Sequence, residues 1–527
     1  MKISLLVLMC ILTSSSAYSN ICFNLKNFKT ESYTFKDDIL IRGFEDVEIA
    51  ANLFHPTDLS ENYPAVIFVN SWSLEDHEYF RQAKILAEKG YIVLSYSTRG
   101  FGCSGGKIDV IGNSDVQDLS KVVDWLEQKT SVDIKNVGIA GISYGGGMAL
   151  MALAKESRIK TGVSMSGWSS LTSALYGERT PRKFWTSLLI TLGFLTGEID
   201  ETIPKMFKNL VTQTNIDETL SWAEERSPIN FISEVNKRNA PVFISQNYGD
   251  NLFQPNPLIK YFNQLTTPKI LDLNQGTHAT AEASGMILKN NYTFNRMQMW
   301  FDLWLKGIKN KKLKLNQVNI QTDLEHKRES YSLDELQRIE DQQWHLHPSR
   351  FLDRSNIKEN KYVGHPVRDF IISRIDTYAT TGIPLLSSIM DGNLKISTYS
   401  YMPIVSNMHA FTFKTKRLKK VKHIRGVPKI SLNIKSTNRK YQLIAYLYDV
   451  DSLGYAKLIT HGAFSSITGH KRAQFELVAT AYDVPRGHRL ALIVDSRDSL
   501  YSPVETRSQV IELNYESTAN TLNIPVK

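Results

Sequence analysis

One short stretch constrains the fold more than any other part of the chain. Residues 137–142 form an apolar run, the turn GISYG (141–145) follows at once, and residues 144–156 then have the apolar spacing of a helix. Small residues on both sides of a serine are typical of a sharp strand-to-helix turn, where a larger side chain would collide with neighbouring backbone. The pattern predicts a nucleophile elbow that lifts Ser143 above a sheet, and a plain glycine-rich turn is the alternative.

The surrounding sequence repeats the alternation of strand and helix from about residue 63 to residue 307. Short apolar runs alternate with stretches of helical spacing, which is typical of a parallel sheet covered by helices. The expected buried strands are 65–69, 91–96, 137–142, 161–166, 241–245 and 269–273. We therefore expect residues 20–307 to form an α/β domain of the α/β-hydrolase class.

One segment, about residues 171–235, interrupts this alternation. It is helical in character and contains the aromatic and apolar run FWTSLLITLGFL (184–195). A run of this length also suits an ordinary buried helix. Its place between two expected strands favours an inserted helical cap.

The pattern changes again after a lysine-rich connector that begins at residue 309. Short β-branched and aromatic runs with a period of two follow, among them 429–436, 441–450 and 488–496. Such runs are typical of a β-sandwich or jelly roll. We expect an all-β jelly-roll domain over residues 318–527.

The N-terminus predicts export. Lys2 precedes the apolar run 3–12, and small polar residues follow to residue 19, as in a signal peptide of residues 1–19. The run is too short to span a bilayer, so a secreted or periplasmic protein without stable membrane insertion is expected. After cleavage only Cys22 and Cys103 would remain, which excludes a framework of several disulfides. A single Cys22–Cys103 disulfide is an open alternative, because the sequence does not fix the distance between the two residues.

Composition and charge narrow the function classes. The net charge of +9 is modest for 527 residues and disfavours a nucleic-acid partner. The densest basic run, residues 414–425, is expected to be a solvated face, with contact to a membrane or cell-wall polyanion as the alternative. No metal or organic cofactor is expected, and the sequence does not fix an oligomeric state.

Chain order supplies two partners for Ser143. A serine hydroxyl needs a base to take its proton, and the first histidine after Ser143 is His278, just beyond the expected strand 269–273. Asp250 is the carboxylate in the loop after the strand 241–245, where it would orient the imidazole. Each residue alone suits a surface loop or an Asp-Asn turn. Their joint order, serine then acid then histidine, predicts a catalytic triad.

The oxyanion of an acyl-transfer intermediate needs preorganised donors. The amide of Tyr144, directly after the serine, is the first candidate. The second should follow the strand 65–69, where the sequence reads Asn70-Ser71-Trp72-Ser73. We expect the Trp72 amide to serve, with its indole N–H, or a role as an aromatic pocket wall, as alternatives.

Together these motifs resemble the X-prolyl dipeptidyl aminopeptidase and cocaine-esterase family, also called the CocE/NonD hydrolases. The matching segments, in family order, are FVNSW (68–72), TRGFGCSGG (98–106), GISYGGG (141–147), RSPINF (226–231), YGDNLF (248–253), GTHA (276–279), WFDLWLKGI (300–308), AYLYDV (445–450) and VPRGHRLALIVDS (484–496). The resemblance implies a hydrolase core, a helical cap and a jelly roll beside the active site. It also supports the roles of Ser143, Asp250 and His278.

The sequence departs from the family at two positions. Trp72 stands where the cocaine esterase has a tyrosine that helps to form the oxyanion hole, so that contact must be made differently here. Ser97 stands where the family often has Asp, which predicts that a supporting interaction near the elbow is absent.

The family divides between ester cleavage and release of X-Pro dipeptides. Recognition of a substrate ammonium would need carboxylates near the cap, and the candidates are Glu178, Glu198, Asp200 and Glu201. We expect a serine hydrolase that cleaves small acyl esters, or amides and short peptides, through an acyl-serine intermediate. An X-Pro dipeptidyl-peptidase is the first alternative, and a surface-binding protein with a degenerate hydrolase core is the second.

Overall fold

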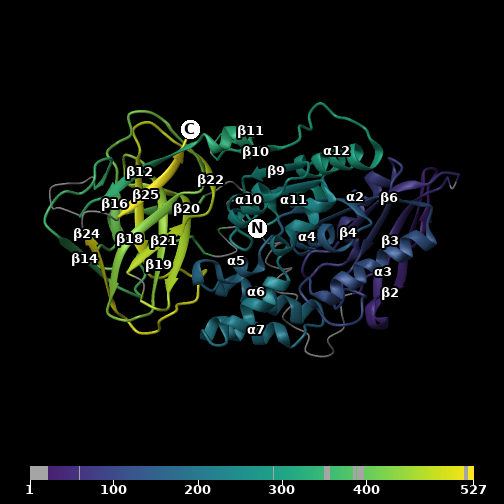
Figure 1. The fold of residues 1–527 in the computed structure, drawn as a ribbon, viewed down its shortest axis with the longest axis horizontal. Helices are drawn as coiled ribbons and strands as arrows, with labels where there is room; N and C mark the ends of the chain where they lie inside the picture. The colour runs from purple at the N-terminus through teal and green to yellow at the C-terminus, as the bar shows by residue number, and fades with distance from the viewer. Residues whose placement is uncertain are drawn as a thin grey trace, which may run out of the picture.

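The computed structural model describes residues 22–58, 60–288, 290–323, 325–348, 356–383, 387, 397–469, 471–515 and 520–527. An α/β domain and an all-β domain lie side by side, and the helices α5 to α7 lie along one side of the α/β domain next to the β-domain (Figure 1). The predicted signal peptide, residues 1–19, lies outside the described residues.

The α/β domain is built on one sheet of eleven strands, in the order β1-β2-β3-β5-β4-β6-β7-β8-β9-β10-β11. All six predicted strands are present, and they run parallel to one another. The bounds are β1 (Phe28–Lys29), β2 (Tyr33–Arg42), β3 (Glu48–Pro56), β4 (Tyr63–Val69), β5 (Ile92–Tyr96), β6 (Val132–Ile142), β7 (Ile159–Met165), β8 (Val242–Asn247), β9 (Lys269–Asn274), β10 (Gln317–Gln321) and β11 (Arg328–Ser332).

Both faces of this sheet are buried, which explains why its central strands are apolar without alternation. In β4, Ile67 and Val69 belong to the core on one face, whereas Val66 and Phe68 belong to the core on the other. Successive side chains of a strand point to opposite faces, so a strand covered by helices on both sides needs apolar residues throughout. The covering helices are α2 (Phe80–Ala87), α3 (Asn113–Lys129), α4 (Tyr144–Lys155), α9 (Ile232–Arg238), α10 (Pro255–Gln264), α11 (Thr280–Ile287) and α12 (Tyr292–Lys306).

The edges of the sheet were not predicted. At one edge β1, β2 and β3 pair antiparallel and join the parallel strands through β5. At the other edge β10 pairs parallel with β9, and β11 pairs antiparallel with β10. The predicted domain boundary at residue 318 is therefore too early, because β10 has the same short apolar pattern as a sandwich strand and only its pairing assigns it to the hydrolase sheet.

The helical insertion between β7 and β8 is present as predicted, with a different end. Its helices are α5 (Leu171–Tyr176), α6 (Lys183–Thr196), α7 (Thr202–Thr212) and α8 (Ile216–Glu225). The next helix, α9, contacts α4 and belongs to the layer that covers the sheet. The cap therefore ends near residue 225 rather than 235.

The C-terminal domain is a sandwich of a nine-stranded and a five-stranded sheet. The first contains β12 (Glu340–Leu346), β13 (Ile357–Lys358), β14 (Val367–Ile372), β17 (Lys422–Gly426), β18 (Lys429–Ser436), β21 (Arg472–Glu476), β22 (Thr480–Val484), β24 (Val510–Tyr515) and β25 (Thr521–Val526). The second contains β15 (Tyr399–Tyr401), β16 (Phe411–Lys414), β19 (Tyr441–Val450), β20 (Tyr455–Ser466) and β23 (Arg489–Asp495), and the short helix α13 (Leu333–Gln337) precedes the domain. The predicted strands 429–436 and 441–450 coincide with β18 and β19.

Strand β19 shows how the two domains meet. Leu443 and Leu447 point into the sandwich core, whereas Ile444 and Tyr446 belong to the hydrophobic core that includes the hydrolase domain. All ten residues of β19 are buried. The outer face of the five-stranded sheet is thus covered by the α/β domain, which makes the two domains one packed unit.

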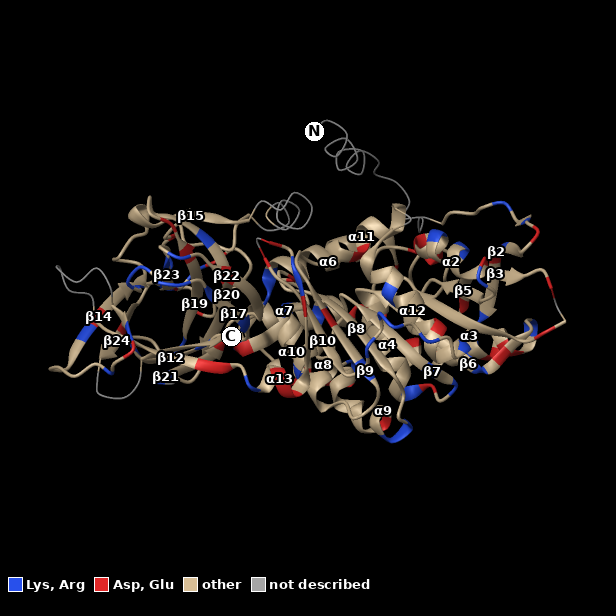
Figure 2. Cartoon of the chain, turned by 90° about the horizontal axis from the view of Figure 1, so that it is seen from above, with Lys and Arg blue, Asp and Glu red and all other residues tan. Residues whose placement is uncertain are grey.

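Three features concern the molecule as a whole. Cys22 and Cys103 are joined by a disulfide across 81 residues of sequence. Within the described ranges, no helix combines the length and the apolar character needed to cross a bilayer. Acidic and basic side chains are interspersed over both domains rather than gathered into one field (Figure 2).

Candidate active site

Ser143 lies in a strained turn between β6 and α4. Its backbone has φ 57° and ψ −112°, a conformation that L-residues rarely adopt outside such turns. The chain passes very close to itself here, since a Cβ atom on Gly145 would lie 2.1 Å from the Val69 carbonyl oxygen and one on Gly141 would lie 2.5 Å from the Gly145 carbonyl carbon. The glycines on both sides of Ser143 are therefore required by the backbone approach, as predicted.

The three predicted residues converge at the carboxyl edge of the sheet. His278 Nε2 lies 2.9 Å from Ser143 Oγ, and His278 Nδ1 lies 2.8 Å from Asp250 Oδ2. Asp250 follows β8 and His278 follows β9, so neighbouring strand ends deliver them to one place. The geometry allows the imidazole to accept the serine proton while the carboxylate holds the other ring nitrogen.

Asp250 is held in place by the backbone of its own loop. Its side chain is fully buried, and its Oδ1 accepts hydrogen bonds from the amides of Leu252 at 2.9 Å and Phe253 at 2.8 Å. Burial lowers the pKa of His278, but the charge and hydrogen bond of Asp250, together with the charge of Glu282, raise it by more, so the net pKa lies above its usual 6.5. The higher pKa makes the imidazole a stronger base for the serine proton.

A second buried carboxyl group, Glu282, was missed by sequence reasoning. It lies on α11, four residues after His278 in the sequence, and accepts hydrogen bonds from Ser166 at 3.1 Å, Ser245 at 3.2 Å and Asn247 at 3.3 Å. Burial raises its pKa above the usual range of a glutamic acid. No spacing in the sequence marked it, because His278 precedes α11 and only Glu282 lies on that helix.

Tyr144 and Trp72, whose amides are the two candidate oxyanion donors, line the same cavity as Ser143. The Tyr144 amide opens α4, and its phenol is anchored by Asp115 at 2.6 Å and by the Ile111 amide at 2.9 Å. The Trp72 indole Nε1 donates to the Leu189 carbonyl oxygen of the cap at 2.9 Å, so the indole alternative is excluded. Within the part of the chain that the structure describes, neither the Tyr144 nor the Trp72 amide donates to a protein oxygen.

The interaction expected to be lost at Ser97 is made from another element. The Ser97 hydroxyl donates to Asp76 Oδ1 at 2.9 Å and accepts from the Asp76 amide at 2.8 Å. Asp76 lies on the 3-10 helix η3 (Asp76–Tyr79) that precedes α2. A carboxyl group therefore does meet this strand end, although it comes from the loop after β4 and not from the end of β5.

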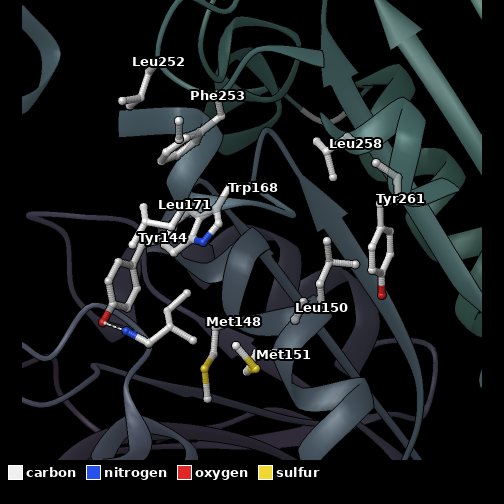
Figure 3. Close-up of a cluster of buried hydrophobic side chains, with 14 of the residues drawn as sticks. Tyr144, Met148, Leu150, Met151, Trp168, Leu171, Leu252, Phe253, Leu258 and Tyr261 are labelled. Atoms are coloured by element: carbon white, nitrogen blue, oxygen red, sulfur yellow. Dashed lines mark hydrogen bonds between the residues drawn. The ribbon is translucent and has the colours of Figure 1, made fainter. Parts of the chain in front are cut away.

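An apolar cavity opens beside Ser143 under the cap. None of its lining side chains is charged. They are Trp72, Val110, Ser143, Tyr144, Trp168, Leu171, Leu175, Thr186, Leu189, Ile190, Ile203, Met206, Phe207, Leu210, Trp222, Leu252 and Phe253. Four of these residues, Tyr144, Trp168, Leu171 and Phe253, lie next to one another in the cluster of buried side chains drawn in Figure 3. Such a lining favours an apolar group of a substrate.

The candidate ammonium-binding carboxylates do not line this cavity. Glu198 and Glu201 are exposed, and Asp200 accepts the Thr202 amide at 2.8 Å. Glu178 lies near Lys260 and Glu476, at the contact between the domains. A second, more polar cavity between the domains has Asp323 in its wall, and that carboxylate pairs with Lys457 at 3.1 Å.

One group of potential metal ligands is present among the described residues. Asp37, Asp76 and His77 bring one donor atom each within 4.8 Å of one another. Both ring nitrogens of His77 are engaged, with Asp37 at 3.0 Å and Glu75 at 3.1 Å. Burial lowers the pKa of His77, but the hydrogen bond to Glu75 and the charges of Asp76 and Asp37 raise it by more, to about 9, so the group is satisfied as an ion-pair cluster.

Comparison with known proteins extends this picture to the whole chain. A solved aminopeptidase from a marine Thaumarchaeota archaeon has a TM-score of 0.72 at 13% identity and covers 97% of this chain and 100% of its own. A CocE/NonD family hydrolase from Staphylococcus aureus has a TM-score of 0.72 at 12% identity, over 98% of this chain and 100% of its own. At such identities these likenesses show the shared fold, a two-domain α/β-hydrolase.

Curated sequences match shorter segments. An uncharacterized 31.7 kDa protein of Escherichia coli is 26% identical over 144 residues, which is 27% of this chain and 50% of that protein. The chain spans half or less of the length of the first curated relatives that it matches.

Two family models match the two domains in the expected order. The model described as X-Pro dipeptidyl-peptidase (S15 family) matches residues 45–280, which include Ser143, Asp250 and His278. The model described as the X-Pro dipeptidyl-peptidase C-terminal non-catalytic domain matches residues 365–524. With the fold that it shares with the CocE/NonD hydrolases, the chain belongs to the X-Pro dipeptidyl-peptidase (S15) family.

Proposed function

We propose that this protein is a serine hydrolase that cleaves esters of apolar carboxylic acids through an acyl-Ser143 intermediate. The observation that carries the proposal is the uncharged cavity whose wall includes Ser143 itself. An acyl group attached to Ser143 can occupy this cavity, and each buried methylene would contribute roughly 0.8 kcal/mol to binding. Family membership supports hydrolysis of esters or of X-Pro peptides.

The residues of the site supply each step of acyl transfer. Ser143 Oγ attacks the ester carbonyl while His278 Nε2 takes its proton, and Asp250 stabilises the imidazolium that forms. The amides of Tyr144 and Trp72 bind the negative oxygen of the tetrahedral intermediate. The imidazolium then returns the proton to the departing alkoxide, which leaves as the alcohol.

Deacylation repeats these steps with water. His278 Nε2 takes a proton from the water, and the resulting hydroxide attacks the acyl carbonyl of the intermediate. The second tetrahedral intermediate collapses as the imidazolium protonates Ser143 Oγ. The products are the free acid and the regenerated serine, and the chemistry needs no metal or organic cofactor.

Release of X-Pro dipeptides is the alternative within the same family. It requires a partner for the substrate ammonium close to Ser143, since an unpaired buried charge is costly. The carboxylates Glu178, Glu198, Asp200 and Glu201 are absent from the cavity wall. The ester reading is therefore favoured.

A substrate panel tests the proposal. We expect turnover of p-nitrophenyl octanoate and butyrate with higher kcat/KM than of the acetate, and no turnover of Gly-Pro-p-nitroanilide. Hydrolysis of the Gly-Pro amide at a rate comparable to the esters would favour the dipeptidyl-peptidase instead. Failure of a fluorophosphonate probe to label the wild-type protein would reject the serine hydrolase altogether.

Export to an oxidising compartment is part of the proposal. The apolar N-terminal run is typical of a signal peptide, and the Cys22–Cys103 disulfide favours a compartment in which such bonds persist. Cell fractionation, with an N-terminal sequence of the mature protein beginning near residue 20, would test it. A protein recovered from the cytoplasm with Met1 or Lys2 at its start would contradict it.

A further inference from the structure

A carboxyl group with no role in the triad lies beneath the loop that presents Trp72. Glu78, on η3, accepts hydrogen bonds from the Ser71 amide and from the Ser71 hydroxyl, both at 2.6 Å. Ser71 is the residue directly before Trp72. The same carboxyl group therefore holds the backbone and the side chain of the residue that determines where the Trp72 amide points.

The contacts of Glu78 continue to the nucleophile elbow. The Ser71 hydroxyl also lies 3.1 Å from the Ile142 carbonyl oxygen, directly before Ser143. The Ile142 amide donates at 2.7 Å to the hydroxyl of Tyr79, the residue directly after Glu78. The two ends of β4 and β6 that carry the oxyanion donors are thus linked through one carboxyl group.

We propose that Glu78 is a positioning residue that fixes the spacing between the Trp72 and Tyr144 amides of the oxyanion hole. The inference rests on the proposed acyl-transfer function and deepens it. Because the donors act only on charge that develops in the transition state, an error of a fraction of an ångström in their spacing lowers the rate more than it lowers substrate binding.

The hydrogen bonds between Glu78 and Ser71 can form whether Glu78 is ionised or protonated. When Glu78 is ionised, the Ser71 hydroxyl donates to it. When Glu78 is protonated, it donates to the Ser71 hydroxyl, which then donates to the Ile142 carbonyl oxygen. Burial, opposed by the hydrogen bonds from Ser71, raises the pKa of Glu78 to about 7, so both forms are present near neutral pH.

A glutamine at position 78 can make the same hydrogen bonds as protonated Glu78. In Glu78→Gln, the amide oxygen can accept from the Ser71 amide while the amide N–H donates to the Ser71 hydroxyl. Glu78→Ala leaves both Ser71 groups without this partner. The two variants therefore separate the hydrogen-bond link from the mere presence of a charge.

The experiment compares kcat and KM of wild type, Glu78→Ala and Glu78→Gln with the best ester of the panel. We expect Glu78→Ala to lower kcat by roughly tenfold to a hundredfold, somewhat less than the loss of a whole oxyanion donor, with KM within about twofold. Glu78→Gln should stay within about threefold of wild type. The rate of fluorophosphonate labelling should fall in parallel with kcat, since the phosphonyl oxygen also occupies the oxyanion hole.

Asp76→Asn provides the matched control. Asp76 is a buried carboxyl group two residues earlier on the same 3-10 helix, but its carboxylate accepts from Asn52 and Ser97 and not from the oxyanion loop. It should keep kcat within about threefold. An equal loss in Asp76→Asn and Glu78→Ala would overturn the proposal, because any loosening of η3 would then suffice.

Other outcomes also decide the matter. Wild-type kcat in Glu78→Ala, or a Glu78→Gln variant as slow as the alanine variant, would overturn the positioning role. If Glu78→Ala does not fold, Ser71→Ala tests the same link, and it should lower kcat by roughly threefold to tenfold at unchanged KM. Unchanged kcat there would overturn the proposal, whereas an inactive, unlabelled wild type would instead refute the hydrolase function.

Discussion

The floor and the roof of the active-site cavity are built from opposite kinds of side chain. The floor consists of loops at the carboxyl edge of the sheet, where Ser143, Asp250 and His278 are joined by hydrogen bonds of 2.8 and 2.9 Å. The roof consists of cap helices whose side chains in the cavity wall, such as Met206 and Leu210, are apolar except for Thr186. The floor determines what reaction is possible, and the roof determines which substrate is bound.

The two regions also differ in how they are held. Floor residues lie where strands end, so the register of the sheet fixes them to within a fraction of an ångström. Roof residues are positioned by packing between helices, where apolar side chains of similar volume are interchangeable at small cost. We therefore expect substitutions in the floor to abolish turnover and substitutions in the roof to redistribute it among substrates.

Removing the nucleophile should give the largest effect. Ser143→Ala is expected to lower kcat by roughly 10⁴-fold to 10⁶-fold, because the attacking atom is lost while binding and the oxyanion donors remain. Ester turnover and fluorophosphonate labelling measure it. Ser164→Ala is the control, since Ser164 is another buried serine, on the adjacent strand β7. Residual turnover above one per cent of wild type in Ser143→Ala would reject the assignment.

The two buried carboxyl groups near His278 should differ sharply. Asp250→Asn is expected to lower kcat by roughly 10³-fold to 10⁴-fold, because an amide N–H cannot replace the acceptor that fixes the imidazole tautomer. Glu282→Gln should lower it less than about tenfold, since Glu282 bonds Ser166, Ser245 and Asn247 rather than the ring. Comparable losses of kcat in both variants, with unchanged thermal stability, would show that Glu282 also helps to orient the imidazole of His278.

A polar group in the roof should change selectivity rather than chemistry. Met206→Gln keeps the side-chain length but places an amide in the apolar cavity, so kcat/KM for an octanoyl ester should fall by roughly tenfold, about the cost of one poorly paired buried polar group. The acetyl ester should change by less than twofold. Met206→Leu is the matched apolar control, and an equal loss for both esters in Met206→Gln would place the acyl chain elsewhere.

The same contrast decides what could be predicted from sequence. The triad was accessible because chain order and strand ends locate it without knowledge of packing. The apolar wall was not, because Val110 and Phe253 enter it from two separate loops, after β5 and after β8, and no periodicity marks them. Trp72 was predicted as a donor, but the engagement of its indole with Leu189 depends on where the cap lies.

The domain boundary at residue 318 was predicted wrongly for a related reason. β10 has the length and composition of a sandwich strand, and only its parallel pairing with β9 assigns it to the hydrolase sheet. Glu78 was missed because nothing in HEYFRQAK distinguishes it from a solvated residue of an amphipathic helix. Its contact with Ser71 is a product of the tight loop after β4, which sequence spacing does not specify.

The pH dependence of the reaction should give the smallest and most specific effect. His278 must be neutral to accept the Ser143 proton, so kcat/KM rises as pH rises through its pKa, which lies above 6.5. In Asp250→Asn the raising charge is lost, so the inflection of the residual activity should move to lower pH. Because Glu78 titrates near pH 7, the profile is best measured in Glu78→Gln as well. An inflection below pH 6.5 in both the wild type and Glu78→Gln would mean that burial lowers the pKa of His278 by more than Asp250 raises it. Desolvation rather than charge would then set the pKa of the base.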